Sequence, residues 1–135
     1  LEDLDNSTEW SDAAPSNTNA ESHYDGFDNT ADILNDLGFG QYAARICSNY
    51  NAGGFNDWYL PSLWELQQLY QSAFVVSYKL SNDGDQSTTV LSSASSYWSS
   101  TEFDSNLSYM VYFPDGTPYL DVKSAAYNVR AIRRF

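Results

Sequence analysis

Two acidic side chains in one polar loop are the chain's best arrangement of metal-binding oxygens. Asp83 and Asp85 flank Gly84, with Asn82 and Gln86 on either side. Hard cations such as calcium prefer carboxylate and amide oxygens, so we expect Asp83 and Asp85 as metal ligands and calcium as the only candidate cofactor. A helix-loop-helix calcium motif needs a longer series of ligands that ends in a bidentate glutamate, which this loop lacks. A solvated turn is the competing interpretation.

Residues for nucleophilic or acid–base catalysis are scarce. His23 is the only histidine and lies in a polar segment, which leaves a Ser-His-Asp triad without a supported base. Cys47 is the only cysteine, so no intrachain disulfide can form, and its predicted helix favours a buried thiol over a nucleophile. We therefore expect that the chain is not an enzyme.

The C-terminal third of the chain has a composition that suits recognition. Tyrosines there alternate with short polar side chains; tyrosine offers large contact area at little entropy cost, and serine and asparagine supply hydrogen bonds. The competing interpretation is that these residues only decorate strands or fill the inner face of a sheet. We predict six ligand-binding residues: Ser100, Glu102, Asp104, Asn106, Tyr112 and Tyr119.

The charge balance excludes some classes of partner. The formal net charge is −12, from 18 acidic and 6 basic residues, and such a field repels nucleic acid and anionic lipids. No run approaches the roughly 18 to 20 apolar residues that span a bilayer, so we expect no membrane insertion. Residues 1–44 contain no Lys or Arg, whereas Arg130, Arg133 and Arg134 supply half of the positive charge. This asymmetry could seat the acidic segment beside the arginines.

The length of 135 residues fits one domain. Residues 1–24 are polar and acidic without helical or strand period, so we expect an irregular arm or linker there and a domain over residues 25–135. Trp10 is the exception, because a lone Trp in a polar tract usually docks on its own domain or on a neighbour. A chain that begins without Met is expected to be a piece of something longer.

Helical patterns fill the first half of that domain. We predict a helix, a break at Gly38 and Gly40, and a second helix, together spanning residues 29–49 and capped at the start by Asn29 and Thr30. A later helix should begin at a capping box.

The capping box consists of Ser62 and Glu65, and its helix should end before the β-branched Val75. After a polar stretch the pattern becomes that of strands, with Tyr109 predicted to face inward and Tyr112 outward. Helices followed by an antiparallel meander predict an α+β domain. The predicted strands are residues 97–102, 107–113, 119–122 and 127–133.

Three blocks of the sequence resemble one family. They are Asp57-Trp58-Tyr59-Leu60-Pro61, Tyr97-Trp98-Ser99-Ser100-Thr101-Glu102 and Val129-Arg130-Ala131-Ile132-Arg133-Arg134-Phe135. Over residues 25–135 the chain resembles the Lcl C-terminal domain family, which is named from a bacterial collagen-like adhesin. The resemblance implies a C-type-lectin-like fold related to formylglycine-generating enzymes, with two main helices on a twisted antiparallel sheet with long loops. It also implies that Trp58 and Trp98 lie in the core.

The function implied by the resemblance is adhesion. We expect a binding module of a bacterial surface, secreted or filament-borne protein, located outside the cell, that holds a glycan or a protein through its C-terminal sheet and loops. The adhesin that names the family is thought to trimerise and to engage sulfated polysaccharides through a basic face. This chain departs from that pattern because its net charge is −12, and this charge favours a neutral sugar, a protein or an abiotic surface as ligand.

Two alternatives remain open. The domain could be an assembly subunit of a fibre or homo-oligomer, with Trp10 docking on the next subunit. It could also resemble the retroelement-diversified variable receptor-binding proteins, which use a similar lectin-like fold. A mass measurement tests the first alternative, and a second copy from the same genome tests the other.

Overall fold

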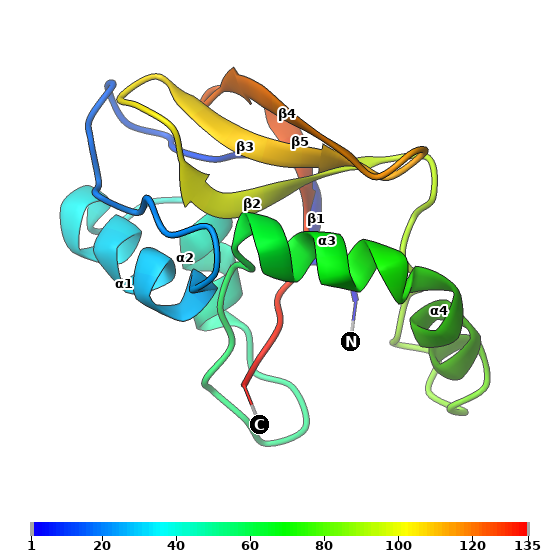
Figure 1. Cartoon of the computed structure of the whole chain (residues 1–135). Helices are drawn as coiled ribbons and strands as arrows, with labels where there is room; N and C mark the ends of the chain where they lie inside the picture. Colours follow the sequence, from blue (N-terminus) through cyan, green and yellow to red (C-terminus); the bar gives the residue numbers. More distant parts are fainter. Residues whose placement is uncertain (1, 135) are drawn as a thin grey trace.

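A computed structural model describes residues 2–134, apart from the side chain of Asn6, and shows an α+β fold with four helices and a five-stranded sheet in that part of the chain. In Figure 1 the four helices lie below strands β3 and β4. In chain order the elements are β1 Asp5–Glu9, α1 Gly26–Leu37, α2 Ala43–Asn49, α3 Leu63–Gln71, α4 Ala73–Ser81, β2 Ser96–Glu102, β3 Leu107–Tyr112, β4 Thr117–Val122 and β5 Ala126–Val129.

The sheet is mixed. Its strand order is β1-β5-β2-β3-β4, and β5 pairs with β2 in parallel while the other neighbours are antiparallel. The expectation of a wholly antiparallel sheet with two main helices is therefore wrong. After β4 the chain crosses to the other side of β2, where β5 fits between β2 and β1.

The first 24 residues contribute to the folded domain, which corrects the expectation of an irregular arm. Thr8 of β1 pairs with Tyr127 of β5, and the indole N–H of the buried Trp10 donates to the Ser99 carbonyl at 2.8 Å. Trp10 therefore docks on its own domain. A polar strand beside one lone Trp has no hydrophobic alternation, so this strand could not be predicted from the pattern of apolar residues.

The first helix begins three residues before the predicted start. Its cap is Asp25, whose carboxylate accepts from the Asp28 N–H at 3.0 Å. Asn29 and Thr30 are instead buried inside α1, where Asn29 donates to the Ser22 carbonyl at 2.6 Å. The residues predicted as caps therefore attach the helix to neighbouring segments.

The start and the end of α3 are both confirmed, because the helix ends at Gln71, but the helix α4 that follows it was not predicted. Ser62 and Glu65 form the predicted capping box. The chain does not leave helical conformation before Val75, because Ser72 stays in the right-handed region and α4 follows at once. β-branched residues lower helix propensity only slightly, so they do not by themselves end a helix.

Two apolar clusters pack on opposite sides of β2. Trp98 lies in the cluster with Trp10, Trp58 and α2, which confirms the core positions of Trp58 and Trp98. Tyr97 lies in the cluster with α3 and Phe113. Because both faces of the sheet are covered here, the predicted alternation of β3 fails: Met110 is buried although it was expected to face outward.

Candidate functional site

Exposed aromatic side chains gather at the end of the sheet where β2 ends and β3 begins. Tyr24 is 72% exposed, Phe103 52% and Trp64 47%, and all three come from different segments. Monomeric proteins rarely expose several large rings together unless the surface binds something. We call this surface the aromatic shelf, and it consists of His23, Tyr24, Trp64, Phe103, Tyr109 and Leu120.

Direct contacts join the residues of the aromatic shelf. The ring centres of Tyr24 and Trp64 lie 6.3 Å apart, and the backbone N–H of Trp64 donates to the His23 carbonyl at 2.9 Å. The Tyr109 ring lies 5.3 Å from that of His23 and 6.0 Å from that of Phe103, both edge to face. Leu120 pairs with Tyr109 across β3 and β4. The shelf is therefore one continuous surface.

The start of α3 fixes the position of Trp64. Leu63 and Leu66 are buried against the sheet, so the helical period turns Trp64 away from it. The Leu63 N–H donates to the Thr101 hydroxyl at 2.9 Å and ties the first turn of α3 to β2. Trp64 is thus presented by a rigid helix rather than by a loop.

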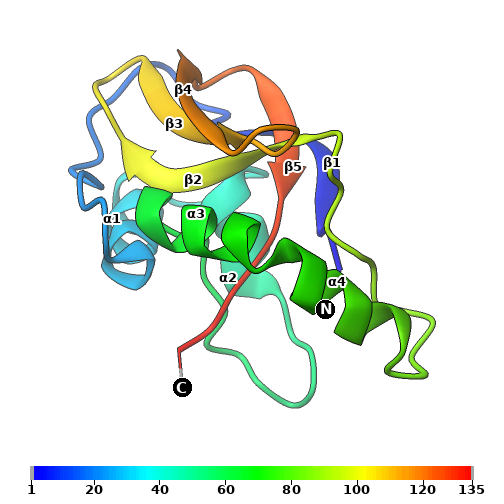
Figure 2. The same cartoon turned by 45° about the vertical axis from the view of Figure 1, so that its right-hand side comes forward.

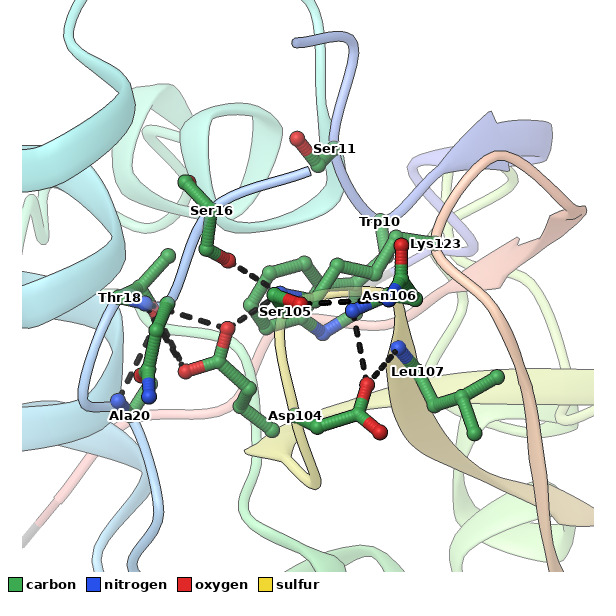
Figure 3. Close-up of polar contacts among 12 residues, drawn as sticks. Trp10, Ser11, Ser16, Thr18, Ala20, Asp104, Ser105, Asn106, Leu107 and Lys123 are labelled. Atoms are coloured by element: carbon green, nitrogen blue, oxygen red, sulfur yellow. Dashed lines mark hydrogen bonds and ion pairs between the residues drawn. The ribbon is translucent and has the colours of Figure 1, made fainter. Parts of the chain in front are cut away.

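A buried ion pair supports the sheet behind the shelf. The Lys123 ammonium donates to the Glu102 carboxylate and, at 2.9 Å, to the Ser16 carbonyl, and it lies 4.6 Å from the centre of the Trp10 ring. Thr18 donates to the same carboxylate from its N–H at 2.9 Å. Figure 3 shows these contacts beside the turn formed by Asp104, Ser105 and Asn106. The pair fastens residues 11–20 to the sheet.

Two of the predicted ligand-binding residues lie inside the protein. Ser100 is fully buried, and Asn29 donates to its hydroxyl at 3.3 Å. Glu102 is buried with Lys123. The sheet is covered on both faces along β2, so neither side chain can meet a ligand at the surface, which corrects the prediction for both.

The other four predicted residues lie at the two ends of the β3–β4 hairpin. Asp104 accepts from the Asn106 and Leu107 N–H groups at 2.8 Å each and shapes the turn before β3, where the Asn106 side chain is exposed. Tyr112 and Tyr119 are exposed at the far end as an edge-to-face pair with centres 6.4 Å apart. The structure therefore does not unite them in one site, and ligand contact at each end stays a prediction.

A small polar hollow adjoins the turn that contains Asn106. It measures about 220 Å³ and is lined mainly by short side chains, among them Ser11, Ser105, Asn106 and Ser124. Lys123 borders the hollow, but its ammonium group is already paired with Glu102. The hollow therefore offers hydroxyl and amide groups rather than a free charge.

The outer edge of β4 is blocked against strand addition. The Lys123 N–H donates to the Asn106 carbonyl at 2.9 Å, which fixes the outward backbone groups of β4 at Pro118, Leu120 and Val122. Pro118 has no N–H, and the Val122 N–H donates to the Asp121 carboxylate at 2.7 Å. A ligand of the hairpin would therefore contact side chains.

The candidate metal ligands stabilise a turn. Asp83 accepts from the Asp85 N–H at 2.9 Å, and Asp85 accepts from the Ser87 N–H at 2.9 Å. The hydrogen bonds from Ser87 lower the pKa of Asp85. Within residues 2–134 no group of three or more His, Cys, Asp or Glu side chains is arranged to hold a metal. Calcium binding stays a prediction.

The basic residues of the C-terminal region are paired with carboxylates. Besides Lys123, three arginines form ion pairs within the part of the chain that the structure describes: Arg130 with Asp3 at 3.0 Å, Arg133 with Asp57 at 2.9 Å, and Arg134 with Asp25. The expected seating of the acidic segment, residues 1–44, beside the arginines is confirmed for Arg130 and Arg134. These pairs leave little positive charge for a polyanion.

None of the six shelf residues was predicted as a ligand-binding residue. Trp64 had a signal, because the predicted capping box and the inward Leu66 place it on the outer face of its helix. Tyr24 and Phe103 had none, since their exposure depends on loops that meet only in the fold.

The remaining reactive group, the thiol of Cys47, is shielded from solvent by its burial. Burial raises the pKa of the Cys47 thiol. Among residues 2–134, no helix combines the length and the apolar character needed to cross a bilayer.

Comparison with family models matches residues 1–133 to the model described as the Lcl C-terminal domain. The match confirms the resemblance drawn from residues 25–135 and extends it through the first 24 residues. A search of curated proteins found no match.

Proposed function

We propose, on the premise that the chain belongs to the Lcl C-terminal domain family, that it is a non-catalytic adhesion module of a bacterial surface, secreted or filament-borne protein. The module works outside the cell and has a C-type-lectin-like architecture. It holds its ligand through the sheet and the adjoining loops. The α+β order of elements and the family match support this proposal.

The aromatic shelf is the observation that carries the proposal. Its rings come from loops, from α3 and from β3, and their mutual contacts fix them before any ligand arrives. Preformed surfaces bind at lower entropic cost than mobile ones. Aromatic rings offer flat apolar area, and the neighbouring polar groups offer hydrogen bonds, a combination that suits the apolar faces and hydroxyls of sugars.

We infer a neutral glycan as the ligand class. The net charge of −12 repels sulfated chains, and the four C-terminal cations named above are already paired. Asp104 directly follows Phe103, so a carboxylate borders the shelf and acts against anionic ligands. A neutral chain meets no such repulsion.

Binding to neutral and sulfated oligosaccharides, with and without a calcium chelator, tests the proposal. We expect neutral glycans to bind and Trp64→Ala to weaken binding about tenfold or more, as loss of an aromatic anchor does. Phe39→Ala is the matched control, because Phe39 is a fully exposed ring away from the shelf. Preference for sulfated chains, or equal losses in the two variants, would contradict the proposal. Binding to a protein but to no glycan would mean that the ligand is a protein and not a neutral glycan.

A further inference from the structure

A second apolar surface lies at the opposite end of the molecule, on α4. Phe74 is 84% exposed and Tyr78 is 61% exposed, while Leu80 is the one buried residue of this helix. Figures 1 and 2 show α4 at the end of the helical layer away from α1. We call this surface the α4 face; it consists of Phe74, Val75, Tyr78 and the neighbouring Val90.

The composition of α4 differs from that of an ordinary surface helix. A solvated helix normally carries polar residues on its outer side, whereas a helix that is apolar all round is normally covered. The outward Phe74, Val75 and Tyr78 belong to the second kind. This exposure costs hydrophobic free energy unless another surface covers it.

The α4 face also borders a cleft without charge. The cleft measures about 520 Å³, and none of the residues that line it is ionised at neutral pH. Its walls come from α3, α4, the segment before β2 and the end of β3. The lining residues are Tyr70, Ala73, Phe74, Ser77, Tyr78, Ser81, Val90, Leu91, Ser93 and Phe113.

The distribution of charge identifies what covers this face. In a chain with 18 acidic residues, residues 66–82 contain no Asp or Glu, and residues 86–101 contain no charged residue at all. Two copies at −12 repel each other over most of their surfaces. That repulsion is weaker at the α4 face, where Lys79 is the one charged residue of the helix and Asp83 and Asp85 lie beyond its C-terminal end.

The face carries both halves of a self-complementary contact. Phe74 projects from it, and the cleft beside Phe74 has an apolar floor that includes Leu91 and Phe113. A two-fold dimer requires a projection and a matching hollow on the same surface patch. We propose that the α4 face binds a second copy of this chain, with Phe74 of each copy entering the cleft of the other.

A membrane surface explains the same residues less well. Helices that lie in a membrane interface carry several Lys or Arg on their polar side, and α4 carries only Lys79. The net charge of −12 also repels anionic lipids. A second copy needs neither feature, because it brings the same uncharged surface.

Sedimentation of the purified chain over a range of concentrations tests the dimer. We expect the average mass to rise from one chain toward two between about 1 μM and about 1 mM, and the dimer to tighten as salt screens the like charges. Phe74→Asp should raise the dimer Kd about thirtyfold or more, as loss of a central interface residue does. The exposed position of Phe74 lets this variant fold, which circular dichroism checks.

Phe39→Asp is the matched control, because it adds the same charge at another fully exposed ring outside the cleft. It should leave the dimer Kd within about threefold of the wild type. A monomer at every concentration and salt level overturns the proposal, and so do equal effects of the two variants. Association that survives Phe74→Asp places the contact elsewhere and also overturns it. Glycan binding at the aromatic shelf is a separate readout, so failure of one proposal does not decide the other.

Discussion

The aromatic shelf and the α4 face both expose large apolar side chains, but they differ in how those side chains are held. On the shelf, Tyr109 contacts the rings of His23 and Phe103, and Tyr24 contacts Trp64. On α4, the rings of Phe74 and Tyr78 have no aromatic partner among residues 2–134. The rings of one surface are held by one another, whereas those of the other project without such ring contacts.

The two surfaces also differ in charge. The carboxylate of Asp104 borders the shelf, whereas residues 66–82 around α4 contain no Asp or Glu. A bordering carboxylate discourages both polyanions and a second copy of an acidic chain. An uncharged surface admits the second copy. In a chain with a net charge of −12, the placement of charge therefore distinguishes the proposed ligand surface, the shelf, from the proposed self-association surface, the α4 face.

The largest effect should come from the core that both surfaces share. Trp98 is fully buried on the side of β2 that faces Trp10, so Trp98→Ala leaves a cavity and should cost about 3 to 5 kcal/mol of unfolding free energy. Both ligand binding and self-association should then fail together. Urea denaturation measures the loss. If Trp98→Ala keeps its stability and loses only ligand binding or only self-association, the two surfaces do not depend on this core.

Loss of the Lys123–Glu102 pair should affect the two surfaces to different degrees. Lys123→Met leaves the Glu102 carboxylate buried without its cation and should cost about 3 kcal/mol. Because the pair supports the sheet behind the shelf, ligand binding should weaken before self-association does. The control is the double variant Lys123→Met with Glu102→Leu, which removes both charges and should recover much of the stability. If it recovers none, the pair contributes more than charge compensation.

The sequence predicted the elements whose signals are local. Ser62 and Glu65 form the expected capping box, because both partners lie within one helical turn. Tyr112 is exposed as the strand alternation indicated. Helix α4 was missed, because Ser72 keeps a helical conformation and the slight cost of Val75 does not stop a helix from forming there.

Features that depend on distant segments were not predictable. Strand β1 exists because β5 offers it an edge 120 residues later in the chain, as the pairing of Thr8 with Tyr127 shows. Glu102 was read as a ligand contact, but Lys123 and Thr18 enclose it from two other segments. Burial of a polar strand residue is decided by what folds over it, which its own neighbours in sequence do not reveal.

Alkaline pH should weaken the core beside the α4 face. Burial, followed by the hydrogen bond to Asp3, raises the pKa of Tyr97 to about 12, and Tyr97 packs against Phe113 of the cleft. The folded state thus holds this proton more tightly than the unfolded state does. Its contribution is complete below about pH 10 and is lost as the pH rises to about 12, a change of about 2 to 3 kcal/mol.

Denaturation at pH 9 and at pH 12 measures this loss, and Tyr97→Phe is the control because it removes the titrating hydroxyl. The variant should lose less stability than the wild type between these pH values. Tyr59 and Tyr127, whose pKa values are also raised to about 12, should keep part of the pH dependence. Identical pH profiles of variant and wild type would mean that Tyr97 is not a source of the alkaline loss.

The smallest effect on stability should come from Tyr112, and it decides how far the ligand surface extends along the hairpin. Tyr112 is exposed and contacts Tyr119 edge to face, so Tyr112→Ala should change the unfolding free energy by less than about 0.5 kcal/mol. Titration calorimetry with a neutral glycan then compares it with Trp64→Ala. Weaker binding in both variants extends the ligand surface from the shelf to the far end of β3. Weaker binding in Trp64→Ala alone confines the ligand to the shelf, because Trp64 lies on α3 beside Tyr24, whereas Tyr112 lies at the end of β3 beside Tyr119.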